Sequence, residues 1–330
     1  MTTTATLSPS VLRIDAAAVA GRIEASIRDD VFRRLRRRGV VVGLSGGVDS
    51  SVVAALAAHA LGSDRVIGLL MPEADSDSAS ARLAHAVAEI LSIETYVEDI
   101  TGTLAAIGCY RRRDDAIRSV VAEYADGYRC KIVLPDLITR SGYPIYSIVV
   151  RAPSGDERRV RLPPDAILGV IAATNFKQRV RKTMEYYYAD RFRFAVAGTA
   201  NRLEHDQGFF VKQGDGAADL KPIAHLYKSQ VYQLAEHFGI PEEIRRRPPT
   251  TDTYSPEHSQ EEFYFGLSLA QTDLCLYAHD HEIPPEAAAD AVGLTPEQVA
   301  RAYGVIASKR EAARYLQMSA LVTEGEEVAE

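Results

Sequence analysis

One segment constrains the fold of this chain more than any other: an apolar strand that runs through a glycine turn into a helix. Val40 to Leu44 reads VVVGL, a run without polar side chains that is typical of a parallel strand buried on both faces. The turn Ser45 to Ser51 follows, and the spacing of apolar residues predicts a helix over Ser51 to Leu61. The chain therefore contains at least one strand–turn–helix unit of the kind that builds α/β proteins.

The same alternation of strand and helix continues along the chain. Apolar runs predict strands at Val66 to Met71 and Thr95 to Ile100, with a helix over Ala79 to Leu91 between them. A long helix over Asp165 to Ala189 then leads to a strand at Arg193 to Gly198. We therefore expect an α/β fold with a doubly wound, mostly parallel sheet.

The remaining segments are expected to surround this sheet. Helical spacing predicts one helix over residues 11–38, another over 116–124 and a third over 228–238. Residues 248–262 are rich in Pro, Thr and Ser, which predicts a loop. Two or three C-terminal helices are expected to close the chain, followed by an acidic tail at 324–330.

The glycine turn has the properties of a phosphate-binding loop. Gly46 and Gly47 let backbone N–H groups approach an anion closely, and the N-terminus of the following helix adds a partial positive charge. Asp49 would repel a phosphate unless a Mg²⁺ ion lay between them, so Asp49 is a candidate metal ligand. The hydroxyls of Ser45, Ser50 and Ser51 are candidate donors to the phosphate oxygens.

The turn sequence SGGVDSS resembles the SGGxDS loop of the ATP pyrophosphatases. It lacks the lysine of the GxxxxGK[ST] loop. The resemblance implies that the loop binds the pyrophosphate part of ATP, that ATP is cleaved between its α and β phosphates, and that the fold is adenine nucleotide α-hydrolase-like. The motif alone indicates a superfamily and leaves the substrate open.

Later segments resemble the NAD synthetase family in particular. Asn175 to Arg181 reads NFKQRVR and resembles the family's NxKxRxR helix. The spacing places Asn175 and Arg179 on one face of a helix, although a solvated basic helix would have the same pattern. Gly198 to Glu204 reads GTANRLE and resembles GTxNxxE. This segment follows a predicted strand end, where open α/β sheets bind ligands.

Three more matches follow in the family's order. Gly208 to Pro222 resembles the family's GxFTKxGDGxxDxxP, and Lys228 matches the lysine of its LxK. Pro248 to Asp252 reads PPTTD and resembles EPTAD. The order of all these motifs is more specific than any one of them.

The resemblance implies a role for each matched residue. The catalytic residues would be Asp49, Lys228, Asp215 and Asp219, and the metal ligands would be Asp49, Glu204 and Thr250. ATP would be bound by Ser45, Gly46, Gly47, Val48, Asp49, Ser50, Ser51, Met71, Thr199, Lys228 and Thr250. The dinucleotide substrate would be bound by Asn175, Arg179, Lys212, Asp215 and Asp219.

The implied reaction is the ATP-dependent formation of an amide, with Mg²⁺ as cofactor. Nicotinic acid adenine dinucleotide, ammonia and ATP would give NAD, AMP and pyrophosphate through an acyl-adenylate. No glutaminase segment is visible, so ammonia would be free or come from a separate donor protein. The family also implies a homodimer, with contacts through the N-terminal helix and the helix of Asn175 to Ala189.

Departures from the family pattern fall in the part that binds the carboxylate substrate. Val211 and Gln213 stand where the family usually has threonine and tyrosine, and His258 to Gly266 lacks the start of the family's GQTDEEELG. A ligase that amidates a different carboxylic acid is therefore one alternative. A nucleotide-binding regulator without activity is another, although the matched acidic residues and Lys228 argue against it.

Residues 131–162 do not fit the strand–helix alternation. Short β-like runs flank the turn Pro153 to Asp156 and predict a β-hairpin inserted into the α/β unit, with a basic character. We expect the hairpin beside the substrate entrance, either as an ordinary surface insertion or as a contact for the substrate or an ammonia donor. Residues 1–280 would form the synthetase-like domain, and residues 281–330 a C-terminal helical extension.

Composition limits the partners and the compartment. The formal charge of −7 argues against general affinity for nucleic acid, and no apolar run is long enough to span a membrane. A tRNA thiolation enzyme would need a basic surface and paired cysteines, whereas Cys109, Cys130 and Cys275 lie far apart. The first ten residues do not resemble a secretory signal, so we expect a cytoplasmic protein.

Overall fold

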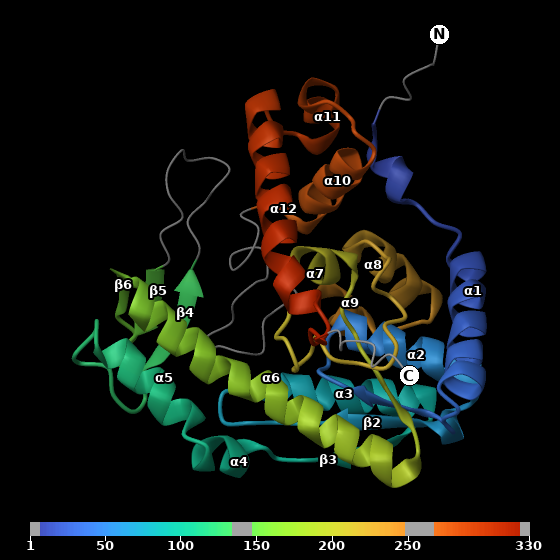
Figure 1. Ribbon diagram of the computed structural model, residues 1–330, viewed down its shortest axis with the longest axis horizontal. Helices are drawn as coiled ribbons and strands as arrows, with labels where there is room; N and C mark the ends of the chain where they lie inside the picture. The colour runs from blue at the N-terminus through green and yellow to red at the C-terminus, as the bar shows by residue number, and fades with distance from the viewer. Residues whose placement is uncertain (1–6, 134–146, 248–266, 324–330) are drawn as a thin grey trace, which may run out of the picture.

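A parallel four-stranded sheet in the order β3–β2–β1–β7 forms the centre of the protein (Figure 1). The computed structural model describes residues 7–133, 147–247 and 267–323. The strands span Val40–Gly43 (β1), Val66–Leu70 (β2), Glu94–Val97 (β3) and Ala195–Ala197 (β7). Three of them lie within the predicted runs, and β3 begins one residue before its run; all are parallel to their neighbours, so the expected mostly parallel sheet is confirmed.

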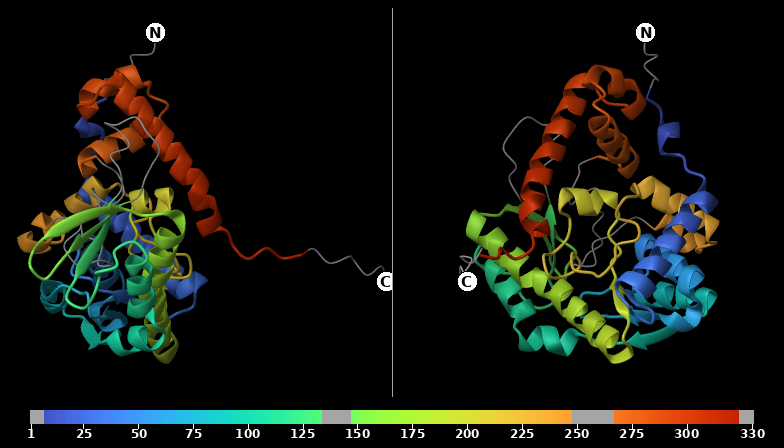
Figure 2. Two further views of the ribbon diagram at one scale, coloured as in Figure 1. Left: turned by 90° about the vertical axis from the view of Figure 1, so that its left-hand side faces the viewer. Right: turned by 45° about the vertical axis from the view of Figure 1, so that its right-hand side comes forward.

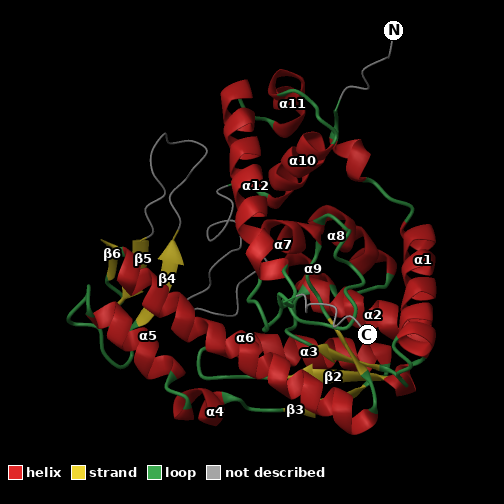
Figure 3. Cartoon of the chain, in the orientation of Figure 1, coloured by secondary structure: helices red, strands yellow, loops and turns green. Residues whose placement is uncertain are grey.

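Helices cover both faces of this sheet (Figures 1 and 3). Val40 and Val42 pack with the helices on one face, and Val41 packs against a helix on the other. The first face is covered by α1 (Ala16–Asp29), α2 (Val48–Leu61), α3 (Ser78–Leu91) and α8 (Lys228–His237), and the second by α6 (Pro164–Phe192). All three valines are fully buried, so a polar side chain there would lose its water without gaining a partner.

The N-terminal helix is shorter than expected. A 3-10 turn at Pro9–Leu12 comes first, α1 begins only at Ala16, and a π-helical turn at Asp30–Arg34 follows it. Asp15 sets the start of α1, because its carboxylate accepts a hydrogen bond from the Ala18 N–H at 3.0 Å. The expectation of one continuous helix over 11–38 is therefore only partly right.

The helix expected over residues 116–124 is misplaced, since only residues 116–118 are helical, at the end of α5. The structure instead forms α4 (Thr101–Ala106) and α5 (Cys109–Arg118), with Gly108 between them at a φ of 73°. A left-handed residue at this point is compatible with glycine and separates the two helices. The run of charged residues in α5 hides its apolar spacing, which explains why the sequence pattern misplaced the helix.

A second, antiparallel sheet lies between β3 and α6 in the chain. Its strands β4 (Arg129–Val133), β5 (Ser147–Arg151) and β6 (Glu157–Arg161) pair in the order β4–β5–β6. The expected hairpin is present as β5 and β6, and β4 adds a third strand. Its inner face carries Ile132 and Ile148, which pack with residues of α5 and α6.

Helices near the C-terminus pack over the carboxyl edge of the parallel sheet (Figure 2). They are α10 (Leu269–Asp280), α11 (Pro285–Val292) and α12 (Pro296–Gln317), and they share an apolar core with Leu203 of α7 (Arg202–Gln207) and with Tyr227. The short α9 (Glu242–Arg246) follows α8. The loop expected at 248–262 lies outside the described residues. No helix of the described ranges is long and apolar enough to cross a membrane.

Replacing Ile148 by Ala should lower the free energy of unfolding by about 2–5 kcal/mol, because a fully buried side chain leaves a cavity between the second sheet and α6. Val149→Ala, on the other face of the same strand, should cost about 0.5 kcal/mol or less. Urea unfolding of the two variants measures the difference. Equal losses would show that the second sheet is not packed as described.

Candidate active site

The glycine loop between β1 and α2 is held by its own hydroxyl groups. The Ser50 and Ser51 hydroxyls donate to the Gly47 carbonyl at 3.1 and 2.8 Å, and the Ser45 hydroxyl accepts from the Gly47 N–H at 3.3 Å. Gly46 has a φ of +75°, and a Cβ there would lie 2.4 Å from the Ser80 carbonyl oxygen at the start of α3. The loop conformation therefore requires glycine at position 46.

Asp49 lies on the first turn of α2, where residues of two other elements reach it. The Lys228 ammonium, on the first residue of α8, forms an ion pair with the Asp49 carboxylate. The Asn201 side chain donates to the second Asp49 oxygen at 3.1 Å. Burial opposes the charge of Lys228, but the carboxylates of Asp49 and Glu204 outweigh it and hold the pKa of the ammonium above its ordinary value.

Glu204 lies on the first turn of α7, fixed by a reciprocal cap. The Asn201 side-chain oxygen accepts from the Glu204 N–H at 3.2 Å, and the Glu204 carboxylate accepts from the Asn201 N–H at 3.0 Å. Asn201 thus connects the two acidic residues that the sequence predicts as metal ligands. The third, Thr250, lies outside the described residues.

The donor chemistry of this site fits a Mg²⁺ ion. Among the described residues no group of three or more His, Cys, Asp or Glu side chains forms a complete metal cage. Mg²⁺ in nucleotide enzymes is usually held by one or two carboxylates, with phosphate oxygens and water completing its shell. Asp49 and Glu204 supply such a pair, because Asn201 donates to the carboxylates of both, at 3.1 and 3.0 Å.

The two aspartates predicted near the substrate carboxylate lie in the segment that follows β7. Asp215 accepts from the Val211 N–H at 2.7 Å, and burial raises its pKa, which that hydrogen bond and the nearby Lys182 oppose. Asp219 is exposed and accepts from the Val196 N–H of β7 at 2.8 Å. Both carboxylates therefore also hold the loop in place.

The predicted substrate residues of α6 lie near the C-terminal helix. Arg179 donates to the Lys212 carbonyl at 3.3 Å, so two predicted residues meet. The Lys212 ammonium donates to the Tyr315 carbonyl of α12 at 2.8 Å and lies 4.2 Å from the centre of its ring. Asn175 is half-buried on α6.

Two residues predicted to bind ATP lie at the carboxyl edge of the sheet. Met71 and Thr199 are half-buried there, just after β2 and β7.

Sequence reasoning missed a charged group beside these residues. Lys182 and Glu185 form a buried ion pair on α6. The Glu185 carboxylate lies over Gly43 at the end of β1, where a Cβ would come within 2.9 Å of its oxygen. Lys221 packs in the same way over Gly198, after the neighbouring strand β7. The i,i+3 spacing of Lys182 and Glu185 was the only available signal, and such pairs are common on exposed helices.

A cavity of about 680 Å³ lies between α1 and the segment after β7. Four basic side chains line it, from Arg22, Arg34, Lys221 and His225. Two carboxylates, from Asp30 and Asp219, line it as well. The volume is sufficient for a nucleotide-sized ligand. The mixture with an excess of basic groups suits an anionic ligand.

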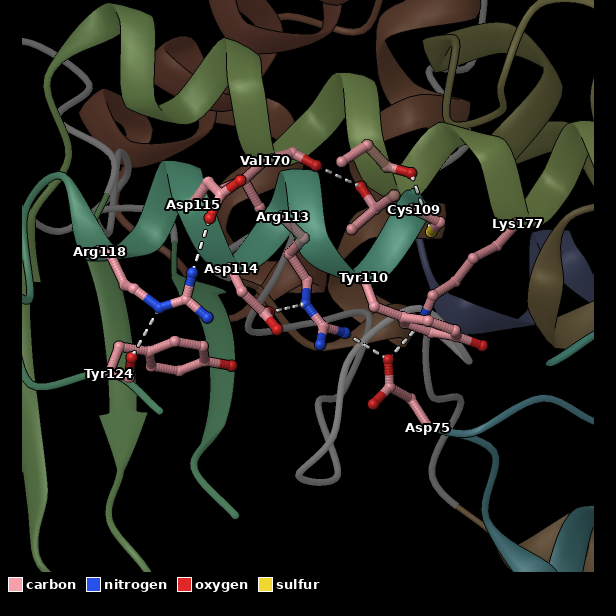
Figure 4. Close-up of polar contacts among 12 residues, drawn as sticks. Asp75, Cys109, Tyr110, Arg113, Asp114, Asp115, Arg118, Tyr124, Val170 and Lys177 are labelled. Atoms are coloured by element: carbon pink, nitrogen blue, oxygen red, sulfur yellow. Dashed lines mark hydrogen bonds and ion pairs between the residues drawn. The ribbon is translucent and has the colours of Figure 1, made fainter. Parts of the chain in front are cut away.

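A second group that sequence reasoning missed is a buried network around Lys177 (Figure 4). The Lys177 ammonium is fully buried and donates to Glu73 at 2.9 Å and to Asp75 at 2.6 Å. Arg113 of α5 also pairs with Asp75, and the Tyr110 hydroxyl donates to Glu73 at 2.9 Å. The network ties the segment after β2 to α5 and α6, and so holds that edge of the sheet beside the glycine loop.

The sequence matches known proteins along most of its length. The family model described as NAD synthase matches residues 19–125 and 161–313. The chain is 56% identical over 318 residues to an NH(3)-dependent NAD(+) synthetase of Rhizobium rhizogenes, with 96% of each chain covered. It is 36% identical to the enzyme of that name from Thermotoga maritima, with 72% of this chain and 79% of the relative covered.

Solved structures show the same fold at low identity. An NMN synthetase from Francisella tularensis has a TM-score of 0.64 at 20% identity, covering 95% of this chain and 100% of that one. An NH3-dependent NAD synthetase from Campylobacter jejuni has a TM-score of 0.61 at 20% identity, covering 94% and 100%. At this identity the likeness concerns the fold alone.

The second sheet lies outside the family model but largely inside the alignment with the Rhizobium rhizogenes relative. The family model leaves out residues 126–160, which hold all three of its strands except the last residue. The Rhizobium rhizogenes relative aligns over 318 residues, which is 96% of this chain, so far fewer residues are unaligned than the family model leaves out. Most of this segment is therefore shared with that relative.

The Lys177 network makes a prediction about stability. Lys177→Met should lower the free energy of unfolding at neutral pH by about 3–5 kcal/mol, because the carboxylates of Glu73 and Asp75 lose a buried counter-charge. Burial alone would raise the pKa of Asp75, but Lys177 and Arg113 lower it below 3.8. In the wild type this carboxylate therefore stabilises the fold above its unfolded pKa, and the contribution is lost as the pH falls through the folded pKa.

The difference between Lys177→Met and the wild type should accordingly shrink as the pH is lowered and Asp75 takes up a proton. Urea unfolding at several pH values measures it. Arg82→Met is a matched control, since it removes a cation from the exposed pair with Glu243 and should change stability little. A Lys177→Met protein as stable as this control would contradict the prediction.

Proposed function

The chain belongs to the NAD synthase family, and we propose on this basis that it is an ammonia-dependent NAD synthetase. Its substrates would be nicotinic acid adenine dinucleotide, ATP and ammonia, and its products NAD, AMP and pyrophosphate. The observation that carries the proposal is the meeting of Asp49, Lys228 and Asn201 beside a glycine loop at the carboxyl edge of the sheet. Ligands of open α/β sheets bind at this edge.

In the first step the substrate carboxylate attacks the α-phosphorus of ATP and pyrophosphate leaves. The backbone N–H groups of the glycine loop and the N-terminus of α2 would bind the departing phosphates. Lys228 would neutralise the charge that develops on them. Mg²⁺, held by Asp49, Glu204 and Thr250, would supply further positive charge at the phosphate oxygens. Because Asp49 would be one of the residues that hold this ion, the Lys228 ammonium would be available to the phosphates.

In the second step ammonia attacks the acyl-adenylate and displaces AMP. The described cysteines do not support a glutaminase within this chain, since Cys109, Cys130 and Cys275 are all buried. Burial also raises the pKa of the Cys275 thiol to about 12, and it raises those of Cys109 and Cys130, whereas a nucleophilic cysteine requires a lowered pKa. Ammonia therefore comes from solution or from a separate donor.

The carboxylate substrate would be bound by Asn175, Arg179, Lys212, Asp215 and Asp219. The contact of Arg179 with Lys212 and the cavity beside Asp219 support this assignment. ATP would contact the loop residues Ser45 to Ser51 together with Met71 and Thr199, which lie at the same edge of the sheet.

We also propose a cytoplasmic homodimer, in which α1 and α6 provide the contacts. The exposed Leu168 and Tyr187 on α6 are apolar surface that such a contact would cover. Residues 1–280 would carry the reaction and 281–330 would extend it. A monomeric mass by light scattering at micromolar concentration would rule out the dimer.

The reaction itself can be tested directly. The purified protein with ATP, Mg²⁺, ammonium chloride and nicotinic acid adenine dinucleotide should form NAD with one AMP and one pyrophosphate for each NAD. Phosphorus NMR and chromatography measure the products. Formation of ADP and phosphate would refute the family chemistry, and AMP release only with a different carboxylic acid would replace the proposed substrate.

Asp49→Asn should lower kcat/KM by at least about 10²–10³-fold, because the amide cannot replace a charged metal ligand. The melting temperature should fall as well, because the nearly buried Lys228 ammonium loses its counter-charge, so turnover is measured at a temperature where circular dichroism shows the variant to be folded. Asp64→Asn, at an exposed position just after α2, is the matched control and should keep wild-type activity. Wild-type turnover by Asp49→Asn in the presence of Mg²⁺ would remove Asp49 from the mechanism.

A further inference from the structure

Asp273 of α10 lies at the start of another helix, the one that begins with Lys228. Its side chain is fully buried. One carboxylate oxygen accepts from the Lys228 N–H at 3.3 Å and the other from the Ser229 N–H at 2.7 Å. The two N–H groups belong to the first turn of α8, where no partner within the helix exists. Asp273 therefore caps α8 from a different element.

The residues next to α8 leave the Lys228 and Ser229 N–H groups to this distant carboxylate. The Gln230 side chain accepts from the Tyr227 N–H at 3.1 Å, and the buried Tyr227 hydroxyl has no partner within the described residues. Most helices are capped by a Ser, Thr, Asp or Asn directly before their first turn. Here a carboxylate 45 residues later in the chain caps the helix, and a negative charge is favourable at the N-terminus of a helix.

The cap acts on the residue that carries the site's cation. Lys228 is the first residue of α8, and only 1% of it is exposed. Its backbone N–H is held by Asp273 and its ammonium by Asp49. A carboxylate therefore holds each end of Lys228: Asp273 the backbone N–H and Asp49 the side-chain ammonium.

Helix α10 is itself fixed to the rest of the site. At its C-terminal end Asp280 pairs with Arg202 of α7, and with Arg310 of α12 at 2.6 Å. Arg310 also pairs with Asp206 of α7 at 2.8 Å. The same helices therefore hold α7, which carries Glu204, and α8, which carries Lys228. The Asp273 carboxylate thus approaches α8 from a helix that ion pairs fix to α7 and α12.

We propose that Asp273 is a positioning residue of the reaction, which sets the Lys228 ammonium for the phosphates of ATP by capping α8 from α10. The proposal rests on the proposed role of Lys228 in binding ATP. It assigns to the C-terminal helices a part in the chemistry, because the carboxylate that fixes the lysine is supplied by α10.

A double-mutant cycle between Asp273 and Lys228 tests this. Asp273→Asn keeps the shape of the side chain but presents an NH2 group to one of the two N–H groups, so at least one hydrogen bond is lost. We expect it to weaken Mg-ATP binding, measured by calorimetry, by about 10- to 100-fold, the usual effect of losing a hydrogen bond to a charged group. The KM for ATP should rise while the KM for the dinucleotide changes little.

The decisive comparison is made in the Lys228→Met background. If Asp273 acts through Lys228, Asp273→Asn should cause no further loss of ATP affinity there. The same fold-loss in both backgrounds, or no loss in the wild type, overturns the proposal. An unchanged ATP affinity for Lys228→Met alone would instead overturn the proposed role of Lys228, so the two failures are distinguishable.

Ser268→Ala is the matched control for a general weakening of α10. Ser268 caps this same helix, with its hydroxyl accepting from the Gln271 N–H at 3.3 Å, and it is exposed. Its loss should lower the melting temperature without changing the KM for ATP. Should Asp273→Asn not fold, Asp273→Ser, which retains an acceptor oxygen, takes its place in the cycle. A Ser268→Ala protein with the same rise in the KM for ATP would show that α10 acts only by its stability.

Discussion

The ion pair between Lys228 and Asp49 is the contact on which the rest of the site depends. It joins the first turn of α2, directly after the glycine loop, to the first turn of α8. A nearly buried lysine is unfavourable unless its charge is compensated and its surroundings are fixed. Asn201 holds the second oxygen of Asp49, and the cap on α7 places Glu204 nearby. The carboxylates of Asp49 and Glu204, which suit a divalent cation, thus lie beside the Lys228 ammonium, which suits a phosphate.

Local patterns were sufficient to predict the sheet and the glycine loop. Val40 to Leu44 is apolar because β1 is buried on both faces, and Gly46 is glycine because of a left-handed backbone packed against Ser80. These causes act within a few residues, so they leave a readable pattern. Asp49 followed from its place in the glycine loop, whereas Glu204 and Lys228 came from the family resemblance. In the structure Lys228 pairs with Asp49, and Asn201 contacts both Asp49 and Glu204.

Contacts between distant residues left no such pattern. Lys177 and Glu73 are 104 residues apart, and Asp273 lies 45 residues after Lys228. In the sequence Lys177 is the lysine of the NxKxRxR match, which does not identify its acidic partners, and Asp273 is one acid in a helical segment. Their importance comes from burial beside specific partners, which only the folded chain shows. The helix α5 was missed for a related reason, since its charged residue Arg113 pairs with Asp75, a partner that the sequence cannot reveal.

The topology of the parallel sheet also explains how the fold accommodates the second sheet. β1 pairs with β2 soon after it in the chain, but its other neighbour, β7, comes more than 150 residues later, with Val40 opposite Ala195. The entropy of closing a loop grows only with the logarithm of its length, so even doubling the connection costs roughly 0.6 kcal/mol. Residues 126–160 lengthen a connection that is already long, and their own apolar core with α6 offsets that loss. Evolution can therefore enlarge the chain between β3 and α6 with little thermodynamic penalty, whereas the same addition between β1 and β2 would separate strands that now assemble as near neighbours. During synthesis, one edge of β1 must wait for β7 until the second sheet has left the ribosome.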